Sequence, residues 1–210
     1  MDWVTISSLA TAGGTSVLAI ATFSSVRSAN RSARVAEQSL LVGLRPVLVP
    51  SKEDDPMQRV GFGDGRRVDV HGHGGTIQID DGAVYMAIAL RNGGQGLAVI
   101  HGWHAHVPPP EGNAVAPDPE DFRRQQIDLY IPAGDTGYWQ GAIRDPGDPQ
   151  LEPVRRAVRE GTRVLVDLLY GDHEGGQRTM ARFSLVDDDD PAGRRALVLR
   201  YWNLDRADPR

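Results

Sequence analysis

Two pairs of histidines are the residues best suited to chemistry in this sequence. His71 and His73 are two residues apart, and so are His104 and His106. Because side chains two apart on a β-strand point to the same face, each pair would present two imidazoles together. If the two strands were neighbours in matching register, the four imidazoles could bind zinc or nickel. The alternative is that the histidines are isolated at the surface or half-buried. The glycines around His71 and His73 favour this alternative, because a glycine-rich segment does not hold metal ligands rigidly.

A second candidate is the short segment Asp172-His173-Glu174. Two carboxylates beside an imidazole suit general acid and base work. However, adjacent side chains diverge in direction, and the sequence contains no Gly-x-Ser-x-Gly nucleophile motif. It also contains no phosphate-binding loop, dinucleotide fingerprint or HExxH zinc motif. A hairpin turn is therefore favoured over a catalytic loop, and we expect no catalytic residues and no cofactor.

Asp167 is unusual because it lies within the apolar run from Val164 to Tyr170. A charged side chain among buried neighbours needs either water or a partner of opposite charge. We therefore expect Asp167 to face solvent on an edge strand or to pair with an arginine such as Arg182.

Downstream of Pro46, short β-branched and aromatic runs are separated by clusters of glycine, proline and aspartate. This pattern is typical of an antiparallel β protein. The segment from Val84 to Leu90 is apolar on both faces, as in a central strand covered on each side. We expect an all-β fold, a two-sheet antiparallel β-sandwich, with one short helix near residues 153–160. The predicted strands are 46–50, 67–70, 76–79, 83–91, 98–107, 126–131, 137–143, 163–170, 178–186 and 196–204.

The first forty residues have a different pattern, because no charged residue occurs from Trp3 to Val26. That length is sufficient for one transmembrane helix. Three arginines follow it, at Arg27, Arg31 and Arg34. We predict a transmembrane helix with a juxtamembrane helical extension over residues 1–44, followed by the β-sandwich domain over residues 45–210. The apolar residues of the predicted anchor are Trp3, Val4, Ile6, Leu9, Val17, Leu18, Ile20, Phe23 and Val26.

The arginines set the expected orientation, because positively charged flanks stay on the cytoplasmic side of a membrane. The C-terminal domain is therefore expected in the cytoplasm, with the arginines close to lipid phosphates or simply solvated. A cleaved signal peptide is disfavoured because no basic residue precedes the apolar run. Serine, threonine and glycine dilute that run, so a surface-lying or soluble helix is an open alternative. The small residues also permit weak self-association of the helix into a homo-oligomer.

The composition limits the classes of partner. The 210 residues carry a formal net charge of −5 and the pI is about 5.6, so we expect no nucleic-acid partner. Cysteine is absent, which excludes disulfides, thiolate zinc sites and cysteine nucleophiles. The expected partners are the lipid bilayer, through the N-terminal helix, and an unknown protein.

A family resemblance is carried by the segments Ala33 to Leu41, Arg45-Pro46-Val47-Leu48, Leu90 to Ala98, Ile131-Pro132-Ala133-Gly134 and Tyr170 to Gly176. These segments resemble those of uncharacterised membrane-anchored proteins of actinomycetes. The resemblance spans most of the chain. It implies an N-terminal helix followed by an immunoglobulin-like β domain, and it brings no established activity.

Together, these features predict a single-pass membrane-anchored β-sandwich module that binds a protein or ligand without catalysis at the cytoplasmic membrane face. Two alternatives stay open. One is a metal-dependent hydrolase that uses the histidine cluster with the Asp172 to Glu174 segment. The other is an extracellular binding or adhesion module, which requires the reversed topology.

Overall fold

The chain separates into two units, Met1–Gly43 and Leu44–Arg210, which are described separately. The computed structural model describes residues 3–108, 115–187 and 193–206. Within that range, the side chains of residues 4–12 are not described, so the predicted anchor residues Val4, Ile6 and Leu9 lie outside the described side chains.

The first unit is one helix, α1 (Trp3–Gly43), of 41 residues. At ~1.5 Å per residue its length is about 60 Å. No proline interrupts it, and it ends at Gly43, before Pro46. Trp3 is 85% exposed, and Arg27, Arg31 and Arg34 are also exposed. Within the described part of the chain, no helix combines the length and the apolar character that crossing a membrane requires.

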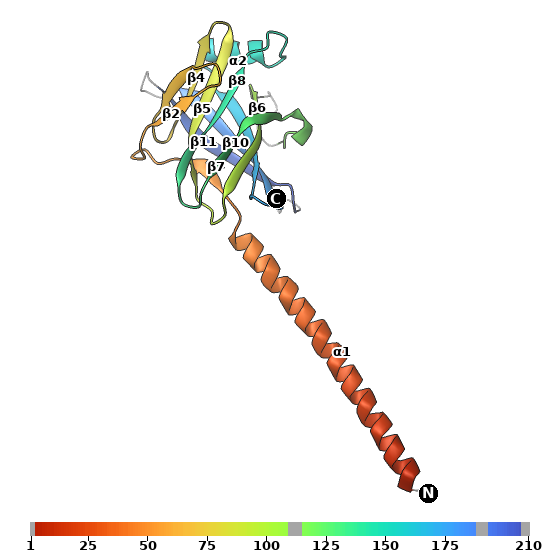
Figure 1. The fold of residues 1–210 in the computed structure, drawn as a ribbon. Coiled ribbons are helices and arrows are strands. Elements are labelled where there is room, and N and C mark those ends of the chain that lie inside the picture. The colour runs from red at the N-terminus through yellow and green to blue at the C-terminus, as the bar shows by residue number, and fades with distance from the viewer. Residues whose placement is uncertain (1–2, 109–114, 188–192, 207–210) are drawn as a thin grey trace. The chain divides into compact units, whose positions relative to one another are not determined.

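The second unit is mostly β-structure, as expected, with antiparallel pairing throughout (Figure 1). Among the described residues of this unit, a 3₁₀ turn, η1 (Pro119–Asp121), and a helix, α2 (Leu151–Arg159), interrupt the strands. The strands are β1 (Leu48–Pro50), β2 (Gln58–Gly61), β3 (Arg67–Val70), β4 (Gly74–Asp80), β5 (Ala83–Asn92), β6 (Ala98–His106), β7 (Arg123–Ile131), β8 (Thr136–Ile143), β9 (Val164–Gly171), β10 (Arg178–Asp187) and β11 (Arg194–Asn203).

Nine of these strands form one curled sheet, in the order β1-β5-β4-β11-β10-β9-β6-β7, with β8 also paired to β5. Only two residue pairs join β4 to β11, Gly75 with Arg194 and Gly74 with Arg195. At the other side of the curl, the Gln125 side chain of β7 donates to the backbone carbonyl of Gln140 in β8 at 3.0 Å. The two layers expected as separate sheets are therefore continuous through this short β4–β11 pairing. The remaining strands, β2 and β3, form a small second sheet.

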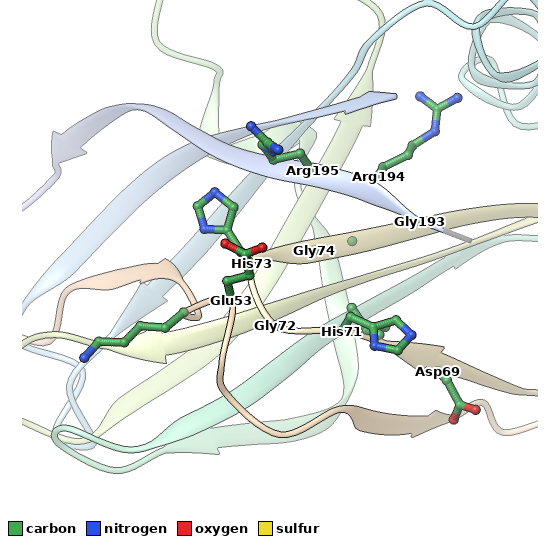
Figure 2. Close-up of a pocket in the computed structure, with 12 residues that line it drawn as sticks. Glu53, Asp69, His71, Gly72, His73, Gly74, Gly193, Arg194 and Arg195 are labelled. Atoms are coloured by element: carbon green, nitrogen blue, oxygen red, sulfur yellow. The ribbon is translucent and has the colours of Figure 1, made fainter. Parts of the chain in front are cut away.

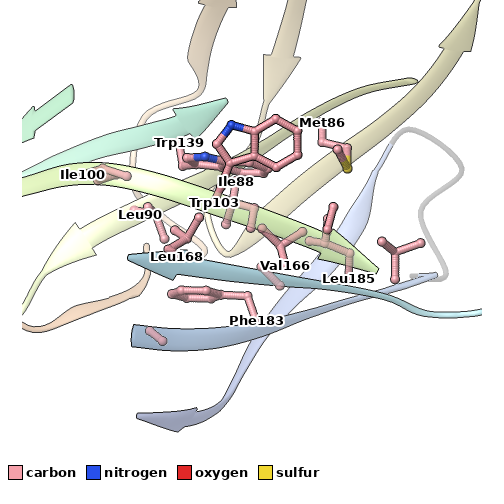
Figure 3. Close-up of a cluster of buried hydrophobic side chains, with 14 of the residues drawn as sticks. Met86, Ile88, Leu90, Ile100, Trp103, Trp139, Val166, Leu168, Phe183 and Leu185 are labelled. Atoms are coloured by element: carbon pink, nitrogen blue, oxygen red, sulfur yellow. The ribbon is translucent and has the colours of Figure 1, made fainter. Parts of the chain in front are cut away.

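The main core lies between the two halves of the curled sheet. Figure 3 shows side chains from β5 and β8 facing side chains from β9 and β10 across it. Trp103 and Trp139 meet edge to face within this core, with ring centroids 5.4 Å apart. The helix α2 covers part of the same core with Leu151, Val154 and Ala157, which are spaced three residues apart on one helix face.

Strand β5 is buried on both faces, as its apolar sequence predicts. Its even-numbered residues, such as Met86 and Ile88, enter the main core. Its odd-numbered residues, such as Tyr85 and Ala87, pack against the β2–β3 hairpin through a second apolar cluster. The rings of Tyr85 and Phe62 meet in a T-shaped contact with a centroid distance of 5.1 Å.

Candidate metal centre

Three neighbouring strands place a histidine, an aspartate and an arginine directly opposite one another. His104 of β6 pairs with Asp167 of β9, and Asp167 pairs in turn with Arg182 of β10. The flanking residues Val166 and Leu168 enter the main core, so Asp167 points to the opposite, outer face of the sheet. The sheet thus builds a row of ionisable side chains across its outer face.

Asp167 and Arg182 form a buried ion pair with two hydrogen bonds. Arg182 Nε donates to Asp167 Oδ1 at 2.7 Å, and Arg182 Nη2 donates to Asp167 Oδ2 at 2.9 Å. The Arg182 side chain is 4% exposed and the Asp167 side chain is 0% exposed. This is one of the two outcomes expected for Asp167 from its position in an apolar run. Trp202 covers the guanidinium of Arg182, with its ring centroid 5.0 Å from Arg182 Cζ.

His106 is the third group on the carboxylate. Its Nε2 atom lies 3.0 Å from Asp167 Oδ2, and its Nδ1 atom lies 3.2 Å from the carbonyl oxygen of Val107. Burial alone raises the pKa of the Asp167 carboxyl. Hydrogen bonds from His106 and Arg182, with the charge of Arg182, outweigh that effect and hold the pKa below its usual range. Asp167 is therefore a carboxylate at neutral pH.

The two histidines of β6 are stacked. The rings of His104 and His106 are nearly parallel, 11° apart in plane and 4.9 Å apart in centroid, as expected for residues two apart on a strand. Burial, followed by the nearby His106, lowers the pKa of His104. Its Nδ1 atom is buried and has no hydrogen-bond partner among the described residues. His104 is therefore a neutral imidazole at neutral pH, the form that binds metal ions.

His104, His106 and Asp167 each offer one ligand atom, and these atoms lie within 4.8 Å of one another. No other group of three or more such residues occurs in the described part of the chain. Asp167 was not expected as a ligand. The sequence did contain one signal for it, a carboxylate in the middle of a buried strand. Which side chains lie beside that carboxylate depends on strand order, which the sequence does not show.

The other histidine pair lies elsewhere. His71 and His73 line a separate pocket of about 610 Å³ between the β3–β4 turn and the start of β11. Strands β11, β10 and β9 separate β4 from β6, so the four imidazoles do not converge. Figure 2 shows His71 and His73 turned away from one another. His73 instead contacts Ser51, whose Oγ accepts from the His73 backbone N–H at 3.0 Å and whose carbonyl lies 3.3 Å from Nδ1.

The Asp172 to Glu174 segment forms the exposed turn between β9 and β10. Asp172 Oδ1 accepts a hydrogen bond from the Gly176 N–H at 2.8 Å, and Gly175 has a positive φ of 75°. Asp172 is five residues beyond Asp167, which corresponds to roughly 16 Å along a strand. The turn therefore contributes nothing to the His104, His106 and Asp167 cluster, and the two halves of the hydrolase hypothesis do not meet.

In the described part of the chain, the fold and the site define an antiparallel β protein with a long N-terminal helix and a His-His-Asp cluster on the outer sheet face. No protein-family model matches the chain, and neither the curated proteins nor the solved structures contain a significant match.

Proposed function

We propose that this protein is a membrane-attached β module that acts by binding and not by catalysis, with α1 as its attachment to the bilayer. The observation that carries the proposal is the distribution of exposed apolar side chains around α1. Val17, Leu18, Ile20 and Phe23 are 67%, 69%, 70% and 69% exposed, and Val26 is 52% exposed.

These five residues are spread around the whole helix. At 100° per residue, their directions relative to Val17 are about 0°, 100°, 300°, 240° and 180°. A protein partner that packs along one side of α1 would cover only one stripe. Lipid surrounds a helix on every side, so a bilayer is the environment that would cover all five.

The polar residues of the same segment are compatible with an apolar surrounding. Thr22 Oγ1 donates to the Leu18 carbonyl at 2.8 Å, and Ser24 Oγ donates to the Ala21 carbonyl at 2.9 Å. A hydroxyl that bonds back to its own helix needs no water. These bonds reduce the cost of moving the serine and threonine side chains into lipid.

The arginines support the orientation that we propose. Arg27, Arg31 and Arg34 point within about 60° of one another on the helix surface, and all three are exposed. One such face can contact the phosphates of a single leaflet. Because arginine-rich flanks stay in the cytoplasm, we place the β module on the cytoplasmic side.

For the β module, we propose an immunoglobulin-like architecture, as the resemblance to the actinomycete proteins implies, and we propose separately that it binds an unknown protein. Asn92 supports a structural role for the shared segment from Leu90 to Ala98. Its Oδ1 accepts from the backbone N–H groups of Val47 and Gly94 at 3.2 and 3.0 Å. Its Nδ2 donates to the carbonyls of Gly96 and Ile131 at 2.6 and 2.9 Å. A fully buried asparagine thus fixes this loop beside β1.

Fractionation of cells that express the full chain tests the attachment. We expect the protein to stay in the membrane pellet after a carbonate wash, and a C-terminal tag to be protected from protease added outside the cells. Leu18→Asp places a charge in the apolar segment and should release the protein. Val35→Asp, at a position that is 55% exposed beyond the arginines, is the matched control and should not. Release of the unaltered protein, or equal behaviour of the two variants, would overturn the proposal.

A further inference from the structure

The cluster on the outer sheet face points to a second property, which does not depend on membrane attachment. We propose that His104, His106 and Asp167 bind one divalent transition-metal ion of the zinc class, with a fourth coordination position open to water. Two imidazole nitrogens and one carboxylate oxygen form a ligand set that such ions accept.

The distances are close to those of an occupied site. Zinc binds nitrogen and oxygen ligands at about 2.0–2.1 Å, so two ligands of a tetrahedral ion lie about 3.3 Å apart. His106 Nε2 and Asp167 Oδ2 are already 3.0 Å apart. An opening of a few tenths of an ångström between these two side chains would admit the ion. The stacked ring of His104 then supplies the third ligand atom, because the ligand atoms of the three residues all lie within 4.8 Å of one another.

His104 also has a ring nitrogen that no other group uses. Its Nδ1 atom is buried and lacks a hydrogen-bond partner in the described part of the chain. The side chain of His106 is 14% exposed, which leaves the cluster open to ions from solvent.

Arg182 acts on the metal through Asp167. Its Nε and Nη2 atoms hold both carboxylate oxygens, so the carboxylate cannot rotate. Oδ2 has two lone pairs, of which Arg182 uses one, and the other now faces His106. Such a partner behind a ligating carboxylate orients it. Its positive charge also opposes the charge of the ion. We therefore expect dissociation constants in the micromolar range and weaker binding than at a site without this arginine.

The experiment uses the full chain, purified in detergent and stripped with a chelator. Titration with Zn²⁺ in a calorimeter should show one equivalent bound. His104→Ala and His106→Ala should each weaken binding by more than about ten-fold. Co²⁺ should give visible absorption bands of a low-coordinate complex that both variants lose. His173→Ala, in the exposed β9–β10 turn, and His71→Ala, in the separate pocket, are matched controls and should leave binding unchanged.

Three results would overturn the inference. The first is an unaltered protein that binds no stoichiometric Zn²⁺. The second is a His104→Ala, His106→Ala double variant that still binds one equivalent, and the third is loss of binding in either control. Circular dichroism of each alanine variant shows whether it is folded. If His106→Ala is unfolded, His106→Gln replaces it, because glutamine keeps a polar side chain at this position. None of these outcomes bears on carbonate extraction, so the metal site and the membrane attachment succeed or fail separately.

Discussion

Arg182 binds both carboxylate oxygens of Asp167 from the directly opposite position on the neighbouring strand, with both side chains buried. A buried ion pair gains little net free energy over an apolar pair of the same shape, yet removing one partner leaves an uncompensated charge. Other registers of β9 and β10 are therefore disfavoured, because they would leave a buried charge unpaired. His106, from the neighbouring strand β6, reaches the same carboxylate, on which the proposed metal site depends.

The buried pair gives the first prediction. Arg182→Met keeps an apolar side chain under Trp202 but leaves the Asp167 carboxylate unpaired, so the free energy of unfolding should fall by about 3–5 kcal/mol. Urea unfolding in metal-free buffer measures the change. Adding Asp167→Asn to Arg182→Met should restore part of the loss. The control is Arg59→Met, which breaks an exposed pair with Asp69 and should leave the stability unchanged. Equal losses for the two arginines would refute this reading.

The second prediction concerns Asn92. Asn92→Asp preserves the shape but replaces an amide that donates to two carbonyls with an oxygen that repels them. The side chain is fully buried, so we expect a loss of at least about 2 kcal/mol in unfolding free energy. Gln78→Ala, at an exposed position of β4, is the comparison and should cost little. A stable Asn92→Asp variant would show that the loop beside β1 tolerates another arrangement.

The third prediction concerns Gly141, which lies against the two core tryptophans. A Cβ atom at Gly141 would lie 2.5 Å from Trp139 Cζ2 and 2.9 Å from Trp103 Cε2. Gly141→Ala should therefore force the indoles apart, lower stability by about 1–3 kcal/mol and change the tryptophan fluorescence. Gly63→Ala meets no atom within 4 Å and serves as the control. An unchanged emission spectrum for Gly141→Ala would mean that the indole packing is looser than described.

The fourth prediction concerns alkaline pH. Burial raises the pKa of Tyr201 to about 12 and raises the pKa of Tyr170 as well. The Tyr201 hydroxyl donates a hydrogen bond to the Leu48 carbonyl at 2.7 Å, and the Tyr170 hydroxyl accepts one from the Leu48 backbone N–H at 3.3 Å. Both tyrosines therefore hold β1 in place. The folded protein favours the neutral phenol. The resulting contribution to the free energy of unfolding is complete below about pH 10, the phenol pKa in the unfolded chain. It is lost as the pH rises through the higher phenol pKa of the folded protein.

Urea unfolding at several pH values between about 9 and 12 would measure this loss. Stability should decline over that window, and Tyr201→Phe should decline less steeply. Ultraviolet absorbance, compared between the unaltered protein and Tyr201→Phe, should show that Tyr201 ionises well above the usual pKa of a phenol. Ionisation of Tyr201 near pH 10, with no loss of stability, would contradict the prediction.

The sequence predicted most strands because their apolar runs are local signals. The apolar residues of Val84 to Leu90 identified β5 as a central strand, and the structure buries both of its faces. The strand β2 was missed because Gln58–Gly61 contains a single large apolar residue, Val60. Its burial comes from β5, which is distant in the sequence.

The candidate site shows where sequence reasoning stops. A charged residue in a buried run needs water or a partner, so solvation predicted that Asp167 would either face solvent or pair with an arginine such as Arg182. The structure shows the pair with Arg182. Which histidines meet depends on strand order, a non-local property that no spacing encodes. Strand β6 lies next to β9 and β4 lies next to β11, so only His104 and His106 reach Asp167.

Membrane attachment through α1 is the central claim, and the depth of its residues in lipid tests it most directly. The chain contains no cysteine, so Ile20→Cys and Gln38→Cys each provide a single position for an environment-sensitive fluorophore. Ile20 is seven residues before Arg27, or about 10 Å along the helix, and Gln38 lies beyond the arginines. In vesicles whose acyl chains carry bromine, we predict strong quenching of the probe at residue 20 and little quenching at residue 38. Equal quenching at both positions, or none at residue 20, would contradict the account.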